Sequence, residues 1–152
     1  MELARPAVAA DRQACTRLLS QALVAAASMR GGAALVGDAT PVTLLERWTH
    51  PGEAVHLAVG EYEGAVVGLL AVAAATRAGG AQTGIVECCY VETAARGVGV
   101  GTALLEAAVA WSRAWGCADM DALALPGDRT TKQRLEAAGF TARLLTLNRR
   151  LD

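Results

Sequence analysis

The segment VETAARGVGVGTALL, residues 91–105, joins an apolar strand pattern to an apolar-periodic helix through a glycine-rich turn. A helix that begins within Gly99 to Gly101 leaves its first backbone N–H groups unpaired at the positive end of the helix dipole. The missing side chains let a diphosphate approach these donors, and Arg96 adds a cation at the edge of the turn. The segment therefore predicts a phosphate-binding loop.

Two common phosphate-binding motifs do not fit this segment. The dinucleotide pattern G-x-G-x-x-G needs a glycine at position 102 or 104, where the chain has Thr102 and Leu104. The nucleoside-triphosphatase loop needs a lysine and then serine or threonine after its second glycine, and Lys132 is the only lysine in the chain. A nucleotide-binding module is therefore disfavoured.

The hexapeptide RGVGVG, residues 96–101, follows the pattern Arg-x-x-Gly-x-Gly. This pattern resembles the acetyl-CoA signature of the GNAT superfamily of N-acetyltransferases. Its flanks extend the resemblance. Residues 85–91 look like the fourth strand of that family, residues 120–125 like the fifth, and LEAAGF, residues 135–140, like the helix that ends in Gly-Phe. Residues 1–7 and the following Ala-Asp pair look like the first strand and turn.

The resemblance implies an α/β fold, with a mixed, mostly antiparallel sheet and a central splayed βαβα core that binds acetyl-CoA. At 152 residues and 53% hydrophobic, the chain is long enough for one domain with a substantial core, so we expect a single N-acetyltransferase domain over residues 1–152.

The residue patterns predict alternating strands and helices. Gly31-Gly32 and Gly79-Gly80 interrupt the chain, and Glu63-Gly64 is typical of a hairpin turn. The predicted strands cover about residues 2–6, 54–62, 65–75, 83–91, 119–125 and 141–150, the last as a strand or hairpin. The predicted helices cover about residues 10–27, 41–48, 100–115 and 128–138.

Charge and composition narrow the class of partner. The net charge is −1, so the chain has no global attraction for nucleic acid or acidic membranes. There is no signal-peptide pattern and no apolar run of 18 residues, and we expect a cytoplasmic protein. The four cysteines lack metal-ligand spacing, so we expect reduced thiols and no metal.

The resemblance further implies transfer of an acetyl group from the cosubstrate acetyl-CoA to a primary amine of a small molecule or peptide, directly and without an acyl-enzyme. The pantetheine arm of acetyl-CoA would lie along Cys89, Tyr90 and Val91, and the Val91 N–H would stabilise the oxyanion. The alternative for Val91 is an ordinary paired strand end.

The resemblance also implies cosubstrate contacts outside the strand. Asp128 matches a position that contacts pantetheine in the family, and it is also a good helix N-cap. The predicted loop contacts are Arg96, Gly97, Val98, Gly99, Val100, Gly101 and Thr102.

Glu87 is the candidate general base. It is the only carboxylate within its predicted strand, and strict alternation would place it on the same face as Cys89 and Val91. A glutamate at the matching position occurs in several GNAT enzymes. The alternative is a carboxylate that pairs with an arginine.

The group that protonates the departing thiolate is where the chain departs from the family. Many members have a tyrosine five residues before the Gly-Phe phenylalanine, and this chain has Leu135 there. Tyr90 is a weak candidate acid, because strict alternation turns it away from the face of Glu87. Solvent can also protonate the thiolate, or the thiolate can leave unprotonated. An acetyl-CoA-binding sensor or partner subunit without turnover is therefore the alternative function.

The acceptor is the least constrained part of the prediction. In the resembled family, the region after the first helix borders the acceptor pocket, and residues 31–52 here contain Asp38, Glu46, Trp48 and His50. These side chains suit a cationic small molecule or a peptide N-terminus. A homodimer is a candidate assembly.

Overall fold

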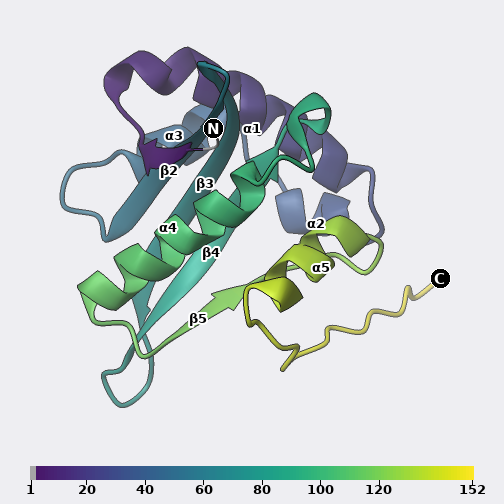
Figure 1. The fold of residues 1–152 in the computed structure, drawn as a ribbon. Coiled ribbons are helices and arrows are strands. Elements are labelled where there is room, and N and C mark those ends of the chain that lie inside the picture. Colours follow the sequence, from purple (N-terminus) through teal and green to yellow (C-terminus); the bar gives the residue numbers. More distant parts are fainter. Residues whose placement is uncertain (1–2) are drawn as a thin grey trace.

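A five-stranded sheet in the order β1-β2-β3-β4-β5 forms the centre of the computed structural model, which describes residues 3–152 (Figure 1). Neighbouring strands are antiparallel except for β4 and β5, which are parallel. This mixed, mostly antiparallel sheet confirms the predicted fold class. The strands are β1 (Leu3–Pro6), β2 (Val55–Tyr62), β3 (Ala65–Thr76), β4 (Gln82–Val91) and β5 (Asp119–Ala122).

Helices cover both faces of the sheet (Figure 1). One core lies between the sheet and α4 and includes Leu70, Leu104 and Ala108. The other lies under α1 and α3 and includes Leu19 and Trp48. The helices are α1 (Arg12–Ala27), α2 (Gly32–Val36), α3 (Pro41–Trp48), α4 (Val100–Trp115) and α5 (Arg129–Ala137), with short 3-10 turns at Ala9–Asp11 and Thr93–Ala95.

The first turns of α4 pack unusually close to the sheet because two strand residues have no side chain. A Cβ atom at Gly60 or at Gly68 would collide with the side chain of Val100 or Leu104. Val100 and Leu104 are 1% and 0% exposed, so close packing fixes the start of α4 against β2 and β3. The loop before this helix is therefore anchored on a rigid element.

The hairpin between β2 and β3 has the predicted turn. Glu63 and Gly64 both have positive φ, 50° and 79°, as a two-residue type I′ turn requires. Glu63 is the only residue other than glycine with positive φ in the part of the chain that the structure describes. This turn sets the register of the two central strands.

The C-terminal segment differs from the prediction. No residue after position 140 is in a strand, and Leu144, Leu145, Leu147 and Leu151 are at least 80% exposed. Strand propensity acts through packing against a neighbouring strand, and this segment pairs with none. The segment contacts β5 through a side-chain ion pair, in which the Arg143 guanidinium binds the Asp121 carboxylate at 2.6 Å. The prediction of a strand or hairpin at residues 141–150 is therefore wrong.

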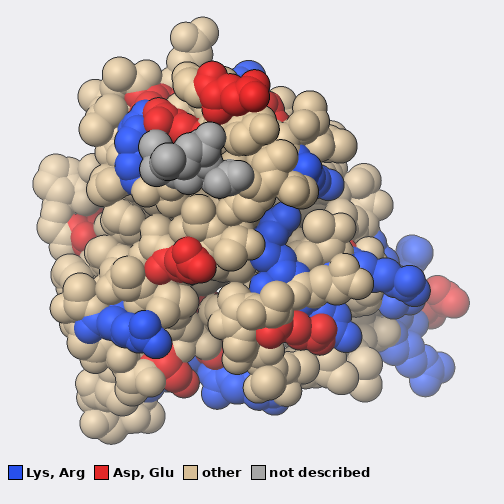
Figure 2. All heavy atoms as spheres, in the orientation of Figure 1, with Lys and Arg blue, Asp and Glu red and all other residues tan. Residues whose placement is uncertain are grey.

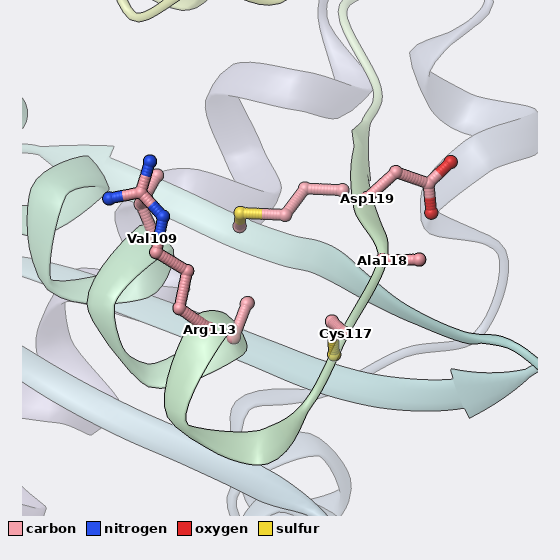
Figure 3. A pocket seen from close by; sticks show the side chains of 7 residues that line it. Val109, Arg113, Cys117, Ala118 and Asp119 are labelled. Carbon is pink, nitrogen blue, oxygen red and sulfur yellow. The ribbon is translucent and has the colours of Figure 1, made fainter.

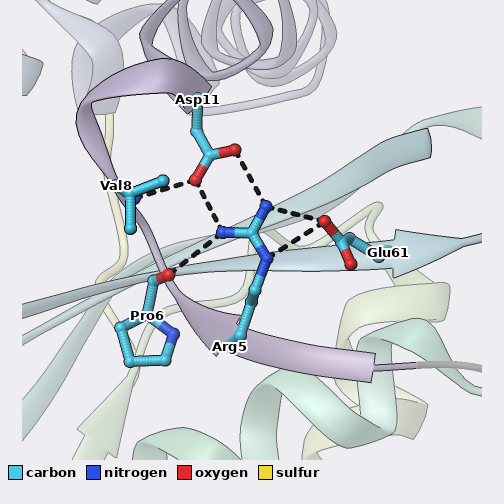
Figure 4. Close-up of polar contacts among 5 residues, drawn as sticks. All are labelled: Arg5, Pro6, Val8, Asp11 and Glu61. Atoms are coloured by element: carbon cyan, nitrogen blue, oxygen red, sulfur yellow. Dashed lines mark hydrogen bonds and ion pairs between the residues drawn. The ribbon is translucent and has the colours of Figure 1, made fainter. Parts of the chain in front are cut away.

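A partly buried ion-pair cluster holds β1 to the rest of the molecule (Figure 4). The Arg5 guanidinium donates to both oxygens of Asp11, at 2.7 and 2.9 Å, and to Glu61 of β2 at 2.6 Å. Asp11 also accepts from the Val8 N–H at 2.8 Å. The hydrogen bonds from Arg5 lower the pKa of Asp11, so the carboxylate stays charged in the folded state.

The surface shows no field of a single sign on the face seen in Figure 2, where acidic and basic side chains are interspersed. This agrees with the net charge of −1. None of the helices within residues 3–152 is both long and apolar enough to cross a membrane.

Candidate functional site

The glycine-rich loop has the predicted shape. Gly97 and Gly99 have positive φ, 85° and 94°, and Gly99 is the N-cap of α4. The Ala103 N–H makes the first helical bond, to the Gly99 carbonyl at 3.0 Å. The N–H groups of residues 100–102 therefore have no partner within the helix, and Gly99 has no side chain to cap them. This arrangement fits a diphosphate.

Arg96 lies at the strand side of this loop. Its Nε donates to the Val91 carbonyl at 3.0 Å, and its guanidinium carbon lies 5.8 Å from the centre of the Tyr90 ring. The side chain thus fastens the loop to the end of β4. Only one of its five N–H donors is used in this contact, so a ligand would be met by the Nη atoms.

Strand β4 has free backbone groups next to the loop. Its parallel pairing with β5 ends at Val86 and Ala122, so residues 87–91 have no partner from β5. On the other side the Glu92 N–H donates to the Val67 carbonyl, and N–H directions alternate along an antiparallel strand. The Val91 N–H therefore points away from β3, into the gap beside β4 that is left open after β5 ends at Ala122.

The same alternation separates the three strand residues predicted to hold pantetheine. The backbone groups of Cys89 and Val91 face the gap, whereas those of Tyr90 face β3. Of the three, Cys89 and Val91 thus remain suited to pair with an extended ligand. The end of the pairing between β4 and β5 at Val86 and Ala122 agrees with the splay expected of the core.

A groove of about 400 Å³ continues from the loop between α4 and α5. Thr102, in the first turn of α4, lies at one wall, and Arg134 of α5 lies at the other. The remaining lining residues are Leu105, Glu106, Val109, Ala110, Arg113, Ala137 and Ala138. Arg134 was not predicted from the sequence, because in this part of the chain only Asp128 and Leu135 match functional positions of the resembled family.

A second hollow, of about 180 Å³, lies at the opposite end of α4 (Figure 3). It is lined by Arg113, Cys117 and Asp119, among others, and it is remote from the glycine-rich loop. The buried hydroxyl of Ser112 beside it has no hydrogen-bond partner among the described residues. None of the predicted site residues lines this hollow.

A β-bulge at Glu87 overturns the predicted face of that residue. Val86 is opposite Val72 and Cys88 is opposite Ala71, so Glu87 is an extra residue with no partner in β3. Val86, Cys89 and Val91 pack on the α4 side, whereas Cys88 and Tyr90 pack on the α1 and α3 side. Glu87 contacts α3 and therefore shares its face with Cys88 and Tyr90, not with Cys89 and Val91.

The carboxylate of Glu87 is held by two consecutive residues of α3. The Trp48 indole N–H donates to Oε2 at 2.5 Å, and the Arg47 guanidinium binds Oε1 at 3.1 Å and Oε2 at 2.9 Å. The arginine-paired arrangement, the structural alternative for Glu87, is therefore present. The side chain is still 22% exposed, so solvent or a ligand can reach it.

The two positions considered for a general acid lie apart. Leu135 is 8% exposed and packs in the core under α4, with no group that could donate a proton. Tyr90 lies on the opposite side of the sheet, with its hydroxyl 3.4 Å from Oε1 of Gln21 in α1. The bulge thus places Tyr90 on the face of Glu87, contrary to the simple alternation.

The cysteines of β4 are poor nucleophiles. Burial raises the pKa of Cys88 to about 12. Burial also raises the pKa of Cys89, although the Arg134 cation opposes the rise. Since the thiolate is the reactive form, neither residue is set up to form an acyl-enzyme. Within residues 3–152, no group of three or more His, Cys, Asp or Glu is arranged to hold a metal ion.

Asp128 and the acceptor region complete the predicted set. Asp128 accepts from the Thr131 N–H at 3.1 Å and caps α5, so its capping role is confirmed. Trp48 is 4% exposed and belongs to the core, with its N–H committed to Glu87. His50 is exposed and bonds the neighbouring Pro51 carbonyl at 3.0 Å. Of the acceptor candidates, Asp38 and Glu46 remain exposed.

Comparison with known proteins identifies the family. Residues 36–140 match the acetyltransferase (GNAT) family, and the chain belongs to it. No match was found among curated proteins.

Solved structures with under 20% identity share the fold over nearly the whole chain. A transcriptional regulator from Bacillus halodurans C-125 has 19% identity and a TM-score of 0.75, covering 99% of this chain and 100% of its own. Glucosamine-6-phosphate N-acetyltransferase from Arabidopsis thaliana has 17% identity and a TM-score of 0.72, and the match covers 100% of this chain and 99% of its own. Ribosomal-protein-alanine N-acetyltransferase from Brucella melitensis biovar Abortus 2308 has 15% identity and a TM-score of 0.71, and the match covers 100% of both chains.

Proposed function

We propose that this chain is an N-acetyltransferase that moves the acetyl group of acetyl-CoA directly to a primary amine. The observation that carries the proposal is the presence of two sets of unpaired backbone groups on either side of the glycine-rich loop, one at the first turn of α4 and one along the edge of β4 after Val86. Diphosphate suits the first set and an extended amide-bearing arm suits the second. GNAT membership supplies the acetyl-transfer class.

The chemistry requires a neutral amine, a donor for the oxyanion and a leaving thiolate. In the proposed reaction a bond forms between the amine nitrogen and the acetyl carbon, and the carbon–sulfur bond breaks. Residues of α3 hold the Glu87 carboxylate on their own face of the sheet, and from there it receives the amine proton through a bridging water. The Val91 N–H points into the gap and is the proposed oxyanion donor. The thiolate takes its proton from solvent, because Leu135 has none to give.

The acceptor is proposed only as a class, a primary amine of a small molecule or peptide. The Arabidopsis enzyme is named for an amino sugar phosphate and the Brucella enzyme for an alanine of a ribosomal protein. The same fold therefore serves both kinds of acceptor. Exposed Asp38 and Glu46 near the α3 side favour a cationic acceptor.

The second candidate function is an acetyl-CoA-binding sensor or partner subunit without turnover. It is favoured by the buried Leu135 and by the contact of the Tyr90 hydroxyl with Gln21, because neither of the two positions considered for the general acid then directs a proton donor toward the groove. Release of free thiol from acetyl-CoA over a mixed library of amines, measured beside acetyl-CoA binding, tests both functions. Thiol release that depends on the amine supports the enzyme, whereas tight binding without release with any amine supports the sensor.

A further inference from the structure

The Arg134 side chain fills the space that the missing side chain of Gly101 leaves open. A Cβ atom built on Gly101 would lie 2.5 Å from Nε and 2.6 Å from Cζ of Arg134. Gly101 is the second residue of α4, so the guanidinium lies next to the first turn of that helix. Arg134 therefore reaches from α5 across the loop end of the groove to the α4 wall.

This position is electrostatically unfavourable for a cation in the absence of an anion. The first turn of α4 presents unpaired N–H groups and the positive end of the helix dipole. Arg134 adds further N–H donors and a full positive charge, and it has no acceptor capacity. Among the described residues, no carboxylate lies within 4.0 Å of its guanidinium, although six other arginines or lysines have such partners.

The neighbouring charges do not supply the missing anion. Glu106 lines the same groove but makes no ion pair with Arg134, and Arg113 adds a second cation further along. Arg96, which the sequence suggested as the cation of the loop, is already bonded to the Val91 carbonyl and stacked on Tyr90. The neutral thiol of Cys89, which is next to Arg134, supplies no negative charge. Donors from α4 and α5 thus converge on one place without an anionic acceptor.

We propose that Arg134 is the cation that binds the diphosphate of coenzyme A, across the groove from the backbone N–H groups of α4. This inference rests on the proposed function, because it assigns a residue to the cosubstrate of that function. The guanidinium fork matches two phosphate oxygens, and the helix donors bind the opposite side of the diphosphate. Gly101 is then required for two reasons: it exposes the backbone and it makes room for Arg134.

Binding measured by calorimetry tests this assignment without any need for turnover. We expect Arg134→Gln to weaken binding of coenzyme A by about 10- to 100-fold, as expected for loss of a charge-assisted contact. Arg96→Ala weakens it by about tenfold at most, because Arg96 is engaged with the strand. Lys132→Gln is the matched control: it removes one charge from the exposed side of α5, where Lys132 lies 3.8 Å from Glu136. This control should change the affinity by less than about twofold.

Shortened ligands identify which part of the cosubstrate Arg134 contacts. The loss in Arg134→Gln should persist for dephospho-coenzyme A, which keeps the diphosphate, and should vanish for pantetheine, which has no phosphate. Equal or tighter binding of coenzyme A by Arg134→Gln would overturn the assignment, and so would an equal loss for pantetheine. A loss seen with coenzyme A but not with dephospho-coenzyme A would place Arg134 at the 3′-phosphate instead and also overturn it.

The two proposals fail in different ways. If the unchanged protein binds coenzyme A and Arg134→Gln weakens that binding, but no amine is acetylated, the catalytic proposal fails and the role of Arg134 stands. If the protein acetylates amines and Arg134→Gln binds coenzyme A normally, only the role of Arg134 fails. Absence of coenzyme A binding by the unchanged protein overturns both.

Discussion

The indole N–H of Trp48 donates a 2.5 Å hydrogen bond to the carboxylate of Glu87, joining the end of α3 to the bulge of β4. Arg47 binds the same carboxylate from the preceding position of α3. The helix thus fixes the orientation of a side chain that the bulge has moved to the α3 face of the sheet. A general base needs such fixed geometry, because proton transfer depends on reaching hydrogen-bond distance.

Replacement of Glu87 tests its role as the base. We expect Glu87→Gln to keep acetyl-CoA affinity and to lower turnover by about 10²-fold or more below the pKa of the amine, with partial recovery at high pH. Stopped measurements of thiol release between pH 6 and pH 9 give the profile. Glu53→Gln, in the exposed loop before β2, serves as the control. Equal turnover of Glu87→Gln and the unchanged protein across this range would return Glu87 to a structural role.

Acetyl-CoA should raise the thermal stability of the protein, whereas NAD and ATP should not. A ligand at a hundredfold excess over its Kd contributes about 2.7 kcal/mol, which corresponds to a rise in Tm of about 5–10 °C for a chain of this size. Gly101→Val should abolish the rise, because its side chain covers the first turn of α4 and displaces Arg134. A melting scan measures both effects. Stabilisation by NAD but not by acetyl-CoA would contradict the proposed cosubstrate.

Tyr90→Phe should leave turnover within about twofold of the unchanged protein, because its hydroxyl faces Gln21 of α1 and not the groove. Turnover should likewise show no alkaline decline that the substitution removes. A pH series of initial rates for both proteins makes the comparison. An alkaline decline that disappears in Tyr90→Phe would make Tyr90 the acid.

The cluster of Arg5, Asp11 and Glu61 should make stability depend on acid. The pKa of Asp11 is lowered in the folded state from its ordinary value of 3.8, chiefly by its hydrogen bonds with Arg5. The stabilisation is therefore complete above that ordinary value and is lost as the pH falls through the lower, folded value. Asp11→Asn should reduce the free energy of unfolding by about 1–3 kcal/mol at pH 7.

Denaturant titrations at several pH values measure this difference. The gap in stability between Asp11→Asn and the unchanged protein should shrink as the pH falls below about 4, because the native carboxylate also becomes protonated there. A gap that stays constant down to pH 2.5 would show that charge on Asp11 is not what stabilises the fold.

The features that the sequence predicted correctly depend on short stretches of chain. The glycine-rich turn, the start of α4 at Val100, the turn at Glu63-Gly64 and the N-cap at Asp128 all follow from backbone preferences of adjacent residues. Their hydrogen bonds close within a few residues, so local sequence is sufficient to specify them. The ordered set of such elements was also enough to indicate the GNAT family.

The features that escaped the sequence depend on contacts between distant segments. The bulge at Glu87 exists only in the register of β4 against β3, and it reverses the face that alternation assigns to Glu87 relative to Cys89. The contact of Arg134 with Gly101 requires α5 to lie across the start of α4. Whether residues 141–150 form a strand depends on a partner strand that they lack here. Local preference cannot report these outcomes, because each is decided by which surfaces meet when the sheet and helices pack.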